Sequence, residues 1–314
     1  MEKDYGHKPV LLDECLDALA IRPDGVYLDG TLGRAGHSLE ILRRLTTGRL
    51  IGIDRDMTAI EAAKERLAEF GDRVTLVHSN FSELGDVLRD LDVSGVDGML
   101  FDLGVSSPQL DEAQRGFSYM QDAPLDMRMD ATAALDAAQV VNTWSYEELR
   151  RILFDYGEER YAPQIAKAIV RRREEKPIET TLELVDIIRS AMPAAALREK
   201  QHPAKRSFQA IRIAVNGELE ALVPMLRAAC EGLAPGGRLA VITFHSLEDR
   251  IVKQTMKELA TGCTCPPEFP VCVCGKKPKM KLITRKPIVS GAAELEYNPR
   301  ARSAKLRVAE RTEW

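Results

Sequence analysis

The sequence lacks a long apolar run and an apolar leader. No segment approaches the roughly 18 to 20 consecutive apolar residues that a membrane-spanning helix needs. The first ten residues are mostly polar and include Glu2, Lys3, Asp4 and Lys8, unlike the apolar stretch of a secretory signal peptide. These absences argue against a membrane protein, and we expect a cytoplasmic protein that makes no contact with a membrane.

Cysteine is scarce, with six residues in 314, and a large excess of charge of either sign is missing. A chain of this length can bury a full core, in one large domain or two smaller ones, without disulfide bonds. The net charge of −4 is not typical of a nucleic-acid-binding protein. However, residues 200–314 carry 20 Lys and Arg against 11 Asp and Glu. This basic segment permits a local RNA-binding surface, and uneven surface charge without a partner is the alternative.

Strands and helices alternate in the first hundred residues. Between the predicted strands lie segments with helical periodicity, and this alternation predicts a parallel sheet with helices on both faces. The strands are expected at residues 26–29, 50–54, 74–77 and 98–102.

The alternation stops between about residues 110 and 200, where only helices are expected, at 136–154, 162–175 and 181–191. The α/β pattern resumes with a predicted helix that is interrupted near Pro224. Polar and apolar residues alternate along the last predicted strand, as they do in an antiparallel edge strand. We therefore expect a discontinuous α/β core of residues 1–112 and 203–314, interrupted by a helical domain at 113–202. The later core elements are predicted at 209–230 (helix), 237–244, 282–289 and 305–309.

A glycine-rich turn, DGTLGRAGH, follows the first predicted strand and precedes a helix. Glycines at a helix N-terminus let a ligand approach the backbone closely. Here they stand at 30, 33 and 36, which is not the G-x-G-x-x-G spacing of a dinucleotide site. The acidic residue Asp29 before the glycines is typical of class I methyltransferases, whereas a tight strand-to-helix turn is the purely structural interpretation.

Polar and aromatic side chains stand at or just beyond the ends of further strands. In open α/β sheets the ligand lies outside the carboxyl ends of the strands. Asp54, 25 residues after Asp29, is suited to accept hydrogen bonds from ribose hydroxyls, unless it only caps a helix. Phe81 is placed to lie against an adenine ring, unless it belongs to the core. Asp102 ends the fourth predicted strand.

Four of the six cysteines are clustered as C-x-C, six residues, C-x-C, with lysines directly after them. Four thiolates can hold a structural Zn²⁺ tetrahedrally, although the usual spacing within each pair is longer. Disulfides are disfavoured in a reducing cytosol, so zinc and free thiols remain the two alternatives. The cluster consists of Cys263, Cys265, Cys272 and Cys274.

Several ordered segments resemble the bacterial ribosomal RNA small subunit methyltransferase H family, also called MraW. The resemblance runs nearly from end to end of the chain. The segments are 29–38 (DGTLGRAGHS), 102–111 (DLGVSSPQLD), 115–117 (RGF), 124–130 (PLDMRMD), 156–160 (YGEER), 202–216 (HPAKRSFQAIRIAVN) and 244–253 (FHSLEDRIVK).

The resemblance implies a class I methyltransferase core with an inserted helical domain, S-adenosylmethionine as cofactor, and methylation of N4 of a cytidine in the decoding region of 16S rRNA. Its partner would be this RNA or the small ribosomal subunit, and a homodimer is among the open oligomeric states. The residues that the resemblance assigns to the cofactor are Ala35, Gly36, His37, Asp54, Phe81, Asp102 and Gln109, and Gly33 of the glycine-rich turn is expected to contact it as well. Because the family often has glycine at position 35, we expect Ala35 to keep a negative φ.

The expected chemistry centres on Asp102, which would accept a hydrogen bond from N4 and orient its lone pair toward the methyl group. His245 is predicted to relay the released proton, with a purely structural histidine as the alternative. A stacking ring would come from Phe117 or Phe244, and Lys205 with Arg206 would bind phosphate. A methyltransferase for a small molecule or protein, and an RNA-binding assembly factor without activity, are the competing functions.

Overall fold

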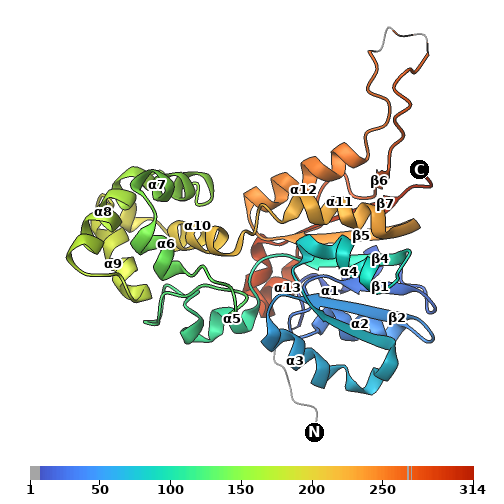
Figure 1. The fold of residues 1–314 in the computed structure, drawn as a ribbon, viewed down its shortest axis with the longest axis horizontal. Helices are drawn as coiled ribbons and strands as arrows, with labels where there is room; N and C mark the ends of the chain where they lie inside the picture. Colours follow the sequence, from blue (N-terminus) through green and yellow to red (C-terminus); the bar gives the residue numbers. More distant parts are fainter. Residues whose placement is uncertain (1–7, 267–268, 270) are drawn as a thin grey trace. The chain divides into compact units, whose positions relative to one another are not determined.

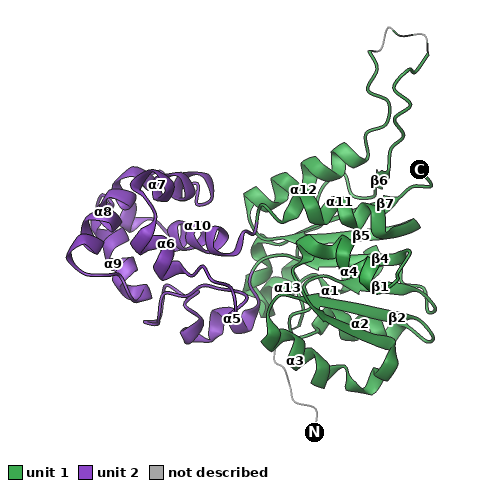
Figure 2. Cartoon of the chain, in the orientation of Figure 1, with its two compact units in different colours: residues 1–104, 219–314 green, residues 105–218 purple. Residues whose placement is uncertain are grey.

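The computed structural model describes residues 8–266, 269 and 271–314. These residues form two compact units, residues 1–104 with 219–314 and residues 105–218 (Figure 2). The sequence places the insert at 113–202. The structure extends the second unit in both directions because Val105 and the helix after residue 202 pack on its helical core. Among the described residues, no helix combines the length and apolar composition needed to cross a membrane.

The first unit is built on one seven-stranded sheet in the order β3-β2-β1-β4-β5-β7-β6 (Figure 1). Strands β1 to β5 pair in parallel, and β7 is antiparallel to both of its neighbours. This order and direction confirm the predicted Rossmann-like fold of class I methyltransferases. The strands are β1 (Val26–Asp29), β2 (Arg49–Asp54), β3 (Val74–His78), β4 (Val96–Asp102), β5 (Leu233–Thr243), β6 (Met280–Leu282) and β7 (Lys305–Arg311).

Both faces of this sheet are buried, because alternate strand residues point to opposite sides. Phe101 packs with apolar residues of α4, α11 and α12, whereas its neighbour Leu100 packs with those of α1, α2 and α3. The helices of the first unit are α1 (Leu12–Leu19), α2 (Gly36–Arg44), α3 (Met57–Arg66), α4 (Leu84–Asp90), α11 (Leu222–Gly232), α12 (Ser246–Leu259) and α13 (Ala292–Tyr297).

The second unit is helical and has a separate core. Helices α8 and α9 begin and end at the predicted residues. Among the described residues of this unit, the only β-pairing is an isolated bridge between Pro124 and Thr180. The predicted helix at 136–154 is two helices, because Ser145 starts a new one with a capping box. The helices are α5 (Ser107–Asp111), α6 (Ala137–Thr143), α7 (Tyr146–Asp155), α8 (Ala162–Glu175), α9 (Thr181–Ala191) and α10 (Lys205–Asn216).

Three further predictions in the last third of the chain were wrong in detail. The helix expected at 209–230 breaks at Gly217, which has a φ of 58° and caps α10, while Pro224 lies within the first turn of α11. The alternating strand β7 is not an edge strand, because β6 pairs with its outer side. The segment predicted as a strand over 282–289 pairs regularly only to Leu282, followed by a single bridge at Ile288.

Candidate active site

Three aspartates end three neighbouring parallel strands. Asp29 ends β1, Asp54 ends β2 and Asp102 ends β4. Because these strands are parallel and in adjacent register, the three carboxylates lie along one edge of the sheet. The sequence-based placement of these residues on a common edge is thus reproduced in the structure.

The turn after β1 combines an open glycine with a packed one. Gly33 has a φ of +50°, and a Cβ built on it would find only the Thr31 carbonyl oxygen, at 3.9 Å. A Cβ on Gly36 would lie 2.6 Å from Cγ of Pro9. The backbone at Gly33 therefore leaves room for a ligand, whereas Gly36 is required by packing whether or not it contacts one.

The expectation of a negative φ at Ala35 was wrong. Ala35 caps the N-terminus of α2 with a φ of 56° and ψ of 34°, in the left-handed region. This conformation costs about 1–2 kcal/mol for a residue with a Cβ. The side chain is fully buried in the sheet core, and burial of one methyl group offsets about 0.8 kcal/mol of that strain.

Asp54 holds the glycine turn in place. Its Oδ2 accepts a hydrogen bond from the Gly33 amide at 2.8 Å, and its Oδ1 accepts one from the Asp56 amide at 2.9 Å. Each oxygen keeps a lone pair for a further donor. The capping alternative does not apply, because Asp56 is the residue that caps α3. Burial raises the pKa of Asp54 to about 6.

Asp29 is committed to structure. Its carboxylate accepts hydrogen bonds from the Ser38 hydroxyl at 2.7 Å and the Thr31 amide at 3.2 Å. Burial raises the pKa of Asp29 to about 6. Sequence reasoning did not single out Ser38 or Thr31, although both are hydroxyl residues within reach of the aspartate that precedes the turn.

Asp102 is the least satisfied polar group on this edge. Its backbone amide donates to Oγ1 of Thr31 at 2.6 Å. The carboxylate Oδ1 is buried and has no hydrogen-bond partner among the described residues, although 26% of the side chain remains exposed. Burial, together with the charges of Asp29 and Glu248, raises the pKa of Asp102 to about 8. A cationic ligand at this edge would lower that pKa again.

His37 lies beside this carboxylate. Its ring is buried, and burial lowers its pKa to about 4, so the ring is neutral at pH 7. Nε2 lies 3.0 Å from the Val10 carbonyl oxygen, which can only accept, so Nε2 carries the proton. The ring is therefore anchored to the segment before α1.

Phe81 and Gln109 occupy different settings. Phe81 follows β3, is partly buried, and meets Phe101 edge to face with centroids 6.2 Å apart. Gln109 belongs to the second unit, where it forms a capping box with Ser106 at the start of α5. The described structure thus leaves part of the Phe81 ring exposed at the sheet edge and gives Gln109 a local helix-capping role.

His245 caps the N-terminus of α12, directly after β5. Its Nδ1 accepts from the Glu248 amide at 3.4 Å, and its Nε2 lies 3.1 Å from Oε1 of Glu248 without hydrogen-bond geometry. Glu248 also accepts from the Phe244 amide at 2.8 Å. Capping boxes are usually recognised in a sequence by Ser, Thr, Asp or Asn at the N-cap. The capping box of α12 was missed because histidine stands at that position.

The two candidate stacking rings differ in accessibility. Phe117 is 6% exposed and belongs to the core of the second unit. Phe244 is partly buried at the end of β5, and a Cβ built on Gly104 would lie 3.6 Å from its ring. Phe244 thus lies at the strand ends of the sheet unit, whereas Phe117 is part of the core of the second unit.

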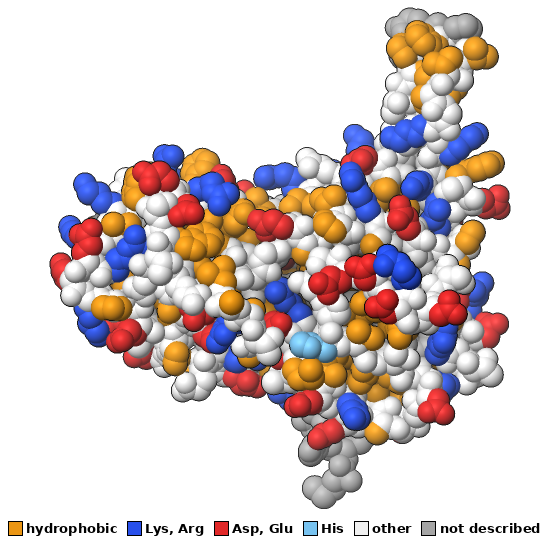
Figure 3. All heavy atoms as spheres, viewed as in Figure 1, with side chains coloured by type: hydrophobic (Ala, Val, Ile, Leu, Met, Phe, Trp, Pro, Cys, Tyr) orange, Lys and Arg blue, Asp and Glu red, His pale blue; other side chains and the backbone are white. Residues whose placement is uncertain are grey.

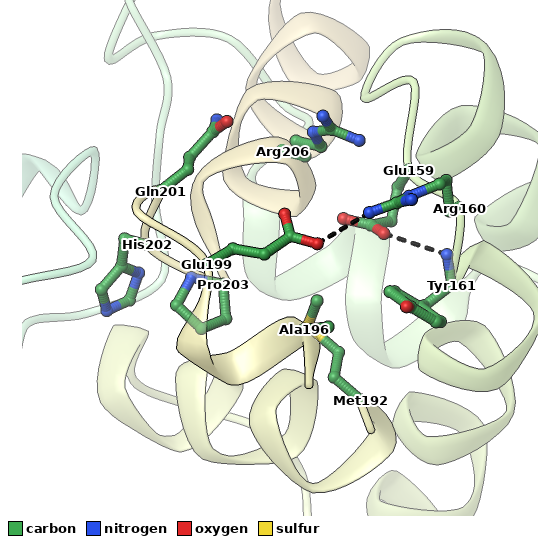
Figure 4. A pocket seen from close by; sticks show the side chains of 10 residues that line it. All are labelled: Glu159, Arg160, Tyr161, Met192, Ala196, Glu199, Gln201, His202, Pro203 and Arg206. Atoms are coloured by element: carbon green, nitrogen blue, oxygen red, sulfur yellow. Dashed lines mark hydrogen bonds and ion pairs between the residues drawn. The ribbon is translucent and has the colours of Figure 1, made fainter. Parts of the chain in front are cut away.

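Lys205 and Arg206 begin α10. Lys205 is exposed, and Nη1 of Arg206 donates to the Glu158 carbonyl oxygen at 3.0 Å. Arg206 lines a pocket of the second unit in which Arg160 pairs with Glu199 at 2.8 Å (Figure 4). The pocket is lined by Glu159, Arg160, Tyr161, Met192, Ala196, Glu199, Gln201, His202, Pro203 and Arg206.

The four clustered cysteines lie in the loop between α12 and β6, apart from the strand ends described above. The candidate active site itself is an edge with an unpartnered carboxylate oxygen, open backbone at a glycine and a partly exposed aromatic ring. This arrangement suits a ligand that combines a ribose, an aromatic base and a positive charge.

The chain is similar to known proteins over nearly its whole length. A profile of the MraW methylase family matches residues 4–312. The chain is 60% identical over 309 residues to the ribosomal RNA small subunit methyltransferase H of Heliobacterium modesticaldum, covering 98% of this chain and 99% of that one. Identity to the protein of the same name from Brevibacillus brevis is 58% over 308 residues, covering 98% of both chains. The chain therefore belongs to the MraW methylase family.

Proposed function

We propose that this protein transfers the methyl group of S-adenosylmethionine to N4 of a specific cytidine in the decoding region of 16S rRNA. The observation that carries the proposal is the buried, unpartnered Oδ1 of Asp102 at the end of β4. Membership of a methylase family, and relatives named for methylation of small-subunit ribosomal RNA, support the choice of reaction and substrate. Such a substrate would place the protein in the cytoplasm.

The residues at the sheet edge fit this cofactor. Asp54 retains lone pairs for the two ribose hydroxyls, and the space at Gly33 admits the chain of atoms beyond the ribose. Phe81 offers a partly exposed ring to the adenine. His37 and Ala35 shape the turn, and Gln109 is proposed as a further contact. When bound, the cofactor supplies an electrophilic methyl group on a positively charged sulfur.

Charge supports the same fit. Burial raises the pKa values of Asp29 and Asp54 to about 6 and that of Asp102 to about 8, and neighbouring carboxylates add to the effect for Asp54 and Asp102. A cation among these groups favours their ionised forms. The sulfonium and ammonium groups of the cofactor provide such cations.

In the proposed mechanism Asp102 acts as the orienting acceptor. Its carboxylate accepts an N–H of the exocyclic amine, which turns the nitrogen lone pair out of conjugation with the ring and toward the methyl group. Most of the rate acceleration would then come from proximity and alignment. Phe244 is proposed to stack on the cytosine, and the base must leave its own stack to reach this edge.

His245 is proposed to relay the proton that the methylated amine releases. Nδ1 accepts a hydrogen bond from the Glu248 amide at 3.4 Å, and this bond must open so that Nδ1 can carry the ring hydrogen. The released proton then goes to Nε2, which has no hydrogen-bond partner in the described chain. Glu248 lies 3.1 Å from that atom and is suited to stabilise a transient positive charge on the ring. Lys205 and Arg206 are proposed to contact the RNA phosphates.

The direct test uses small ribosomal subunits that lack the modification, incubated with the protein and radiolabelled S-adenosylmethionine. After digestion of the RNA, we expect the label in N4-methylcytidine. The Asp102→Asn variant should incorporate at least about a hundredfold less label than the wild type, because it removes a contact made in the transition state. The control Asp86→Asn alters an exposed carboxylate of α4 and should retain activity. Label in a different nucleoside would overturn the proposed chemistry.

A further inference from the structure

The loop between α12 and β6 brings four thiols together far from the strand ends of the sheet. All four Sγ atoms lie within 4.8 Å of one another. Figure 1 shows this loop as a long projection from the sheet unit. The thiols belong to Cys263 and Cys265 on the outgoing arm and to Cys272 and Cys274 on the returning arm.

The spacing of the sulfur atoms matches a metal site rather than disulfide bonds. Sγ of Cys274 lies 3.6 Å from that of Cys272 and 3.7 Å from that of Cys263. Ligands about 2.3 Å from a tetrahedral zinc ion stand about 3.8 Å apart, whereas a disulfide bond is about 2.05 Å long. Neighbouring thiols thus have nearly the separation that a shared zinc ion requires.

Backbone amides point at two of the sulfurs. The amide of Cys265 donates to Sγ of Cys263, and the amide of Val273 donates to Sγ of Cys265, each at 3.4 Å. Such hydrogen bonds stabilise thiolate charge and orient metal ligands. They also show that the backbone of both arms is arranged around the sulfur cluster.

The cluster is not explained by packing. Cys263, Cys272 and Cys274 are exposed and Cys265 is partly exposed, whereas Cys15 and Cys230 are fully buried in the core. The base of the loop is fixed to the sheet unit, because the Lys279 amide donates to the Leu259 carbonyl oxygen at 2.9 Å. Beyond this base, apolar burial provides little stability, since Val271 and Val273 are about 70% exposed.

We propose that Cys263, Cys265, Cys272 and Cys274 bind one structural Zn²⁺, with release of the thiol protons to solvent. The ion joins the two arms beyond the fixed base and substitutes for the missing core of the loop. Exposed lysines follow directly and gather where the loop leaves the sheet unit (Figure 3). The ion would hold this basic segment in one conformation. The lysines are Lys276, Lys277, Lys279 and Lys281.

The test is metal binding by the full chain under reducing conditions. After dialysis against a chelator and titration with Zn²⁺, we expect one zinc per chain by elemental analysis. Co²⁺ in its place should give the intense visible absorption of tetrahedral thiolate coordination. The double variant Cys265→Ser with Cys272→Ser should lose both signals, and Cys230→Ser, which removes a buried thiol, should keep both.

A thermal melt of each variant monitors the sheet unit independently of the loop. Zinc retained by the double variant would overturn the proposal, as would failure of the reduced, folded chain to bind zinc or cobalt. A mass lower by four hydrogens in the purified protein, unchanged by zinc, would show two disulfides in place of the metal site. None of these outcomes depends on methyl transfer, so the zinc site and the proposed activity fail or stand separately.

Discussion

Nδ1 of His37 lies 3.9 Å from Oδ2 of Asp102. Because Nε2 of His37 donates to the Val10 carbonyl oxygen, Nδ1 presents a lone pair to the carboxyl group. A neutral histidine in this position offers no positive charge to Asp102. The unliganded protein therefore keeps an aspartate with a pKa of about 8 at the end of β4, ready to ionise when a cation arrives.

The affinity for S-adenosylmethionine should increase with pH. A cationic ligand favours ionised Asp102, so binding below pH 8 requires loss of a proton. With a pKa of about 8 in the free protein, the Kd should fall about tenfold between pH 7 and pH 9. Isothermal titration calorimetry in buffers of different ionisation enthalpy measures both Kd and proton release. In the Asp102→Asn variant the pH dependence of the Kd should disappear. A wild-type Kd that is independent of pH would contradict the prediction.

Stability of the unliganded protein should change with pH in the opposite direction. Asp102 has a higher pKa in the folded chain than its ordinary value of 3.8, so the folded state binds the proton more tightly than the unfolded state. Its contribution to the free energy of unfolding is full below about pH 4 and is lost as pH rises through about 8. Chemical denaturation should show that Asp102→Asn gains stability relative to wild type as pH rises over this range.

Asp54→Asn should weaken cofactor binding more than catalysis. The amide has one acceptor oxygen, so it cannot accept from both the Gly33 and Asp56 amides and from a ribose. Loss of hydrogen bonds to a charged acceptor corresponds to about 1.5–3 kcal/mol, or roughly a 10- to 150-fold higher Kd. The rate at saturating cofactor should change less. A Kd equal to that of the Asp86→Asn control would show that Asp54 does not bind the cofactor.

Gly36→Ala should destabilise the turn after β1. The added Cβ would lie 2.6 Å from Cγ of Pro9, so the segment before α1 must move. We expect a loss of about 1–3 kcal/mol in the free energy of unfolding, with weaker cofactor binding as a consequence. Gly291→Ala is the matched control, because a Cβ there meets nothing within 4 Å. Equal stability of the two variants would show that Pro9 yields without cost.

Lys205→Ala combined with Arg206→Ala should reduce RNA affinity and its salt dependence while leaving cofactor affinity unchanged. Loss of two phosphate contacts lowers the slope of log K against log salt by about 1.4–1.8. Filter binding at several salt concentrations gives this slope. The control variant Lys167→Ala removes an exposed charge from α8 and should leave this slope unaltered. An unchanged slope in the double variant would place the RNA contacts elsewhere.

Much of the sheet could be predicted from the sequence, because its strands are short apolar runs that end in polar residues. The same pattern located Asp29, Asp54 and Asp102 on one edge, since parallel strands bring their carboxyl ends together. However, the periodicity of a strand does not predict which strands pair with it in the sheet. The alternation in β7 was therefore assigned to an edge strand, while β6 occupies the edge.

Tertiary contacts decided what the sequence could not. Ala35 accepts a left-handed conformation because its methyl group is buried in the core, a compensation that no local rule includes. Similarly, Gly217 rather than Pro224 separates α10 from α11, because proline is tolerated in the first turn of a helix. The high pKa of Asp102 arises from burial in the folded chain and from the charges of Asp29 and Glu248, which are far from it in sequence.

The position of the helical unit within the chain has a consequence during translation. Strand β4 ends at Asp102, and its neighbour β5 begins at Leu233. The nascent sheet must therefore wait while about 130 residues are synthesised, or roughly 7 to 26 seconds at common elongation rates. During this time β4 presents an unpaired edge, which is prone to aggregation. The helical unit, whose residues are contiguous, can fold on the ribosome before the sheet is complete.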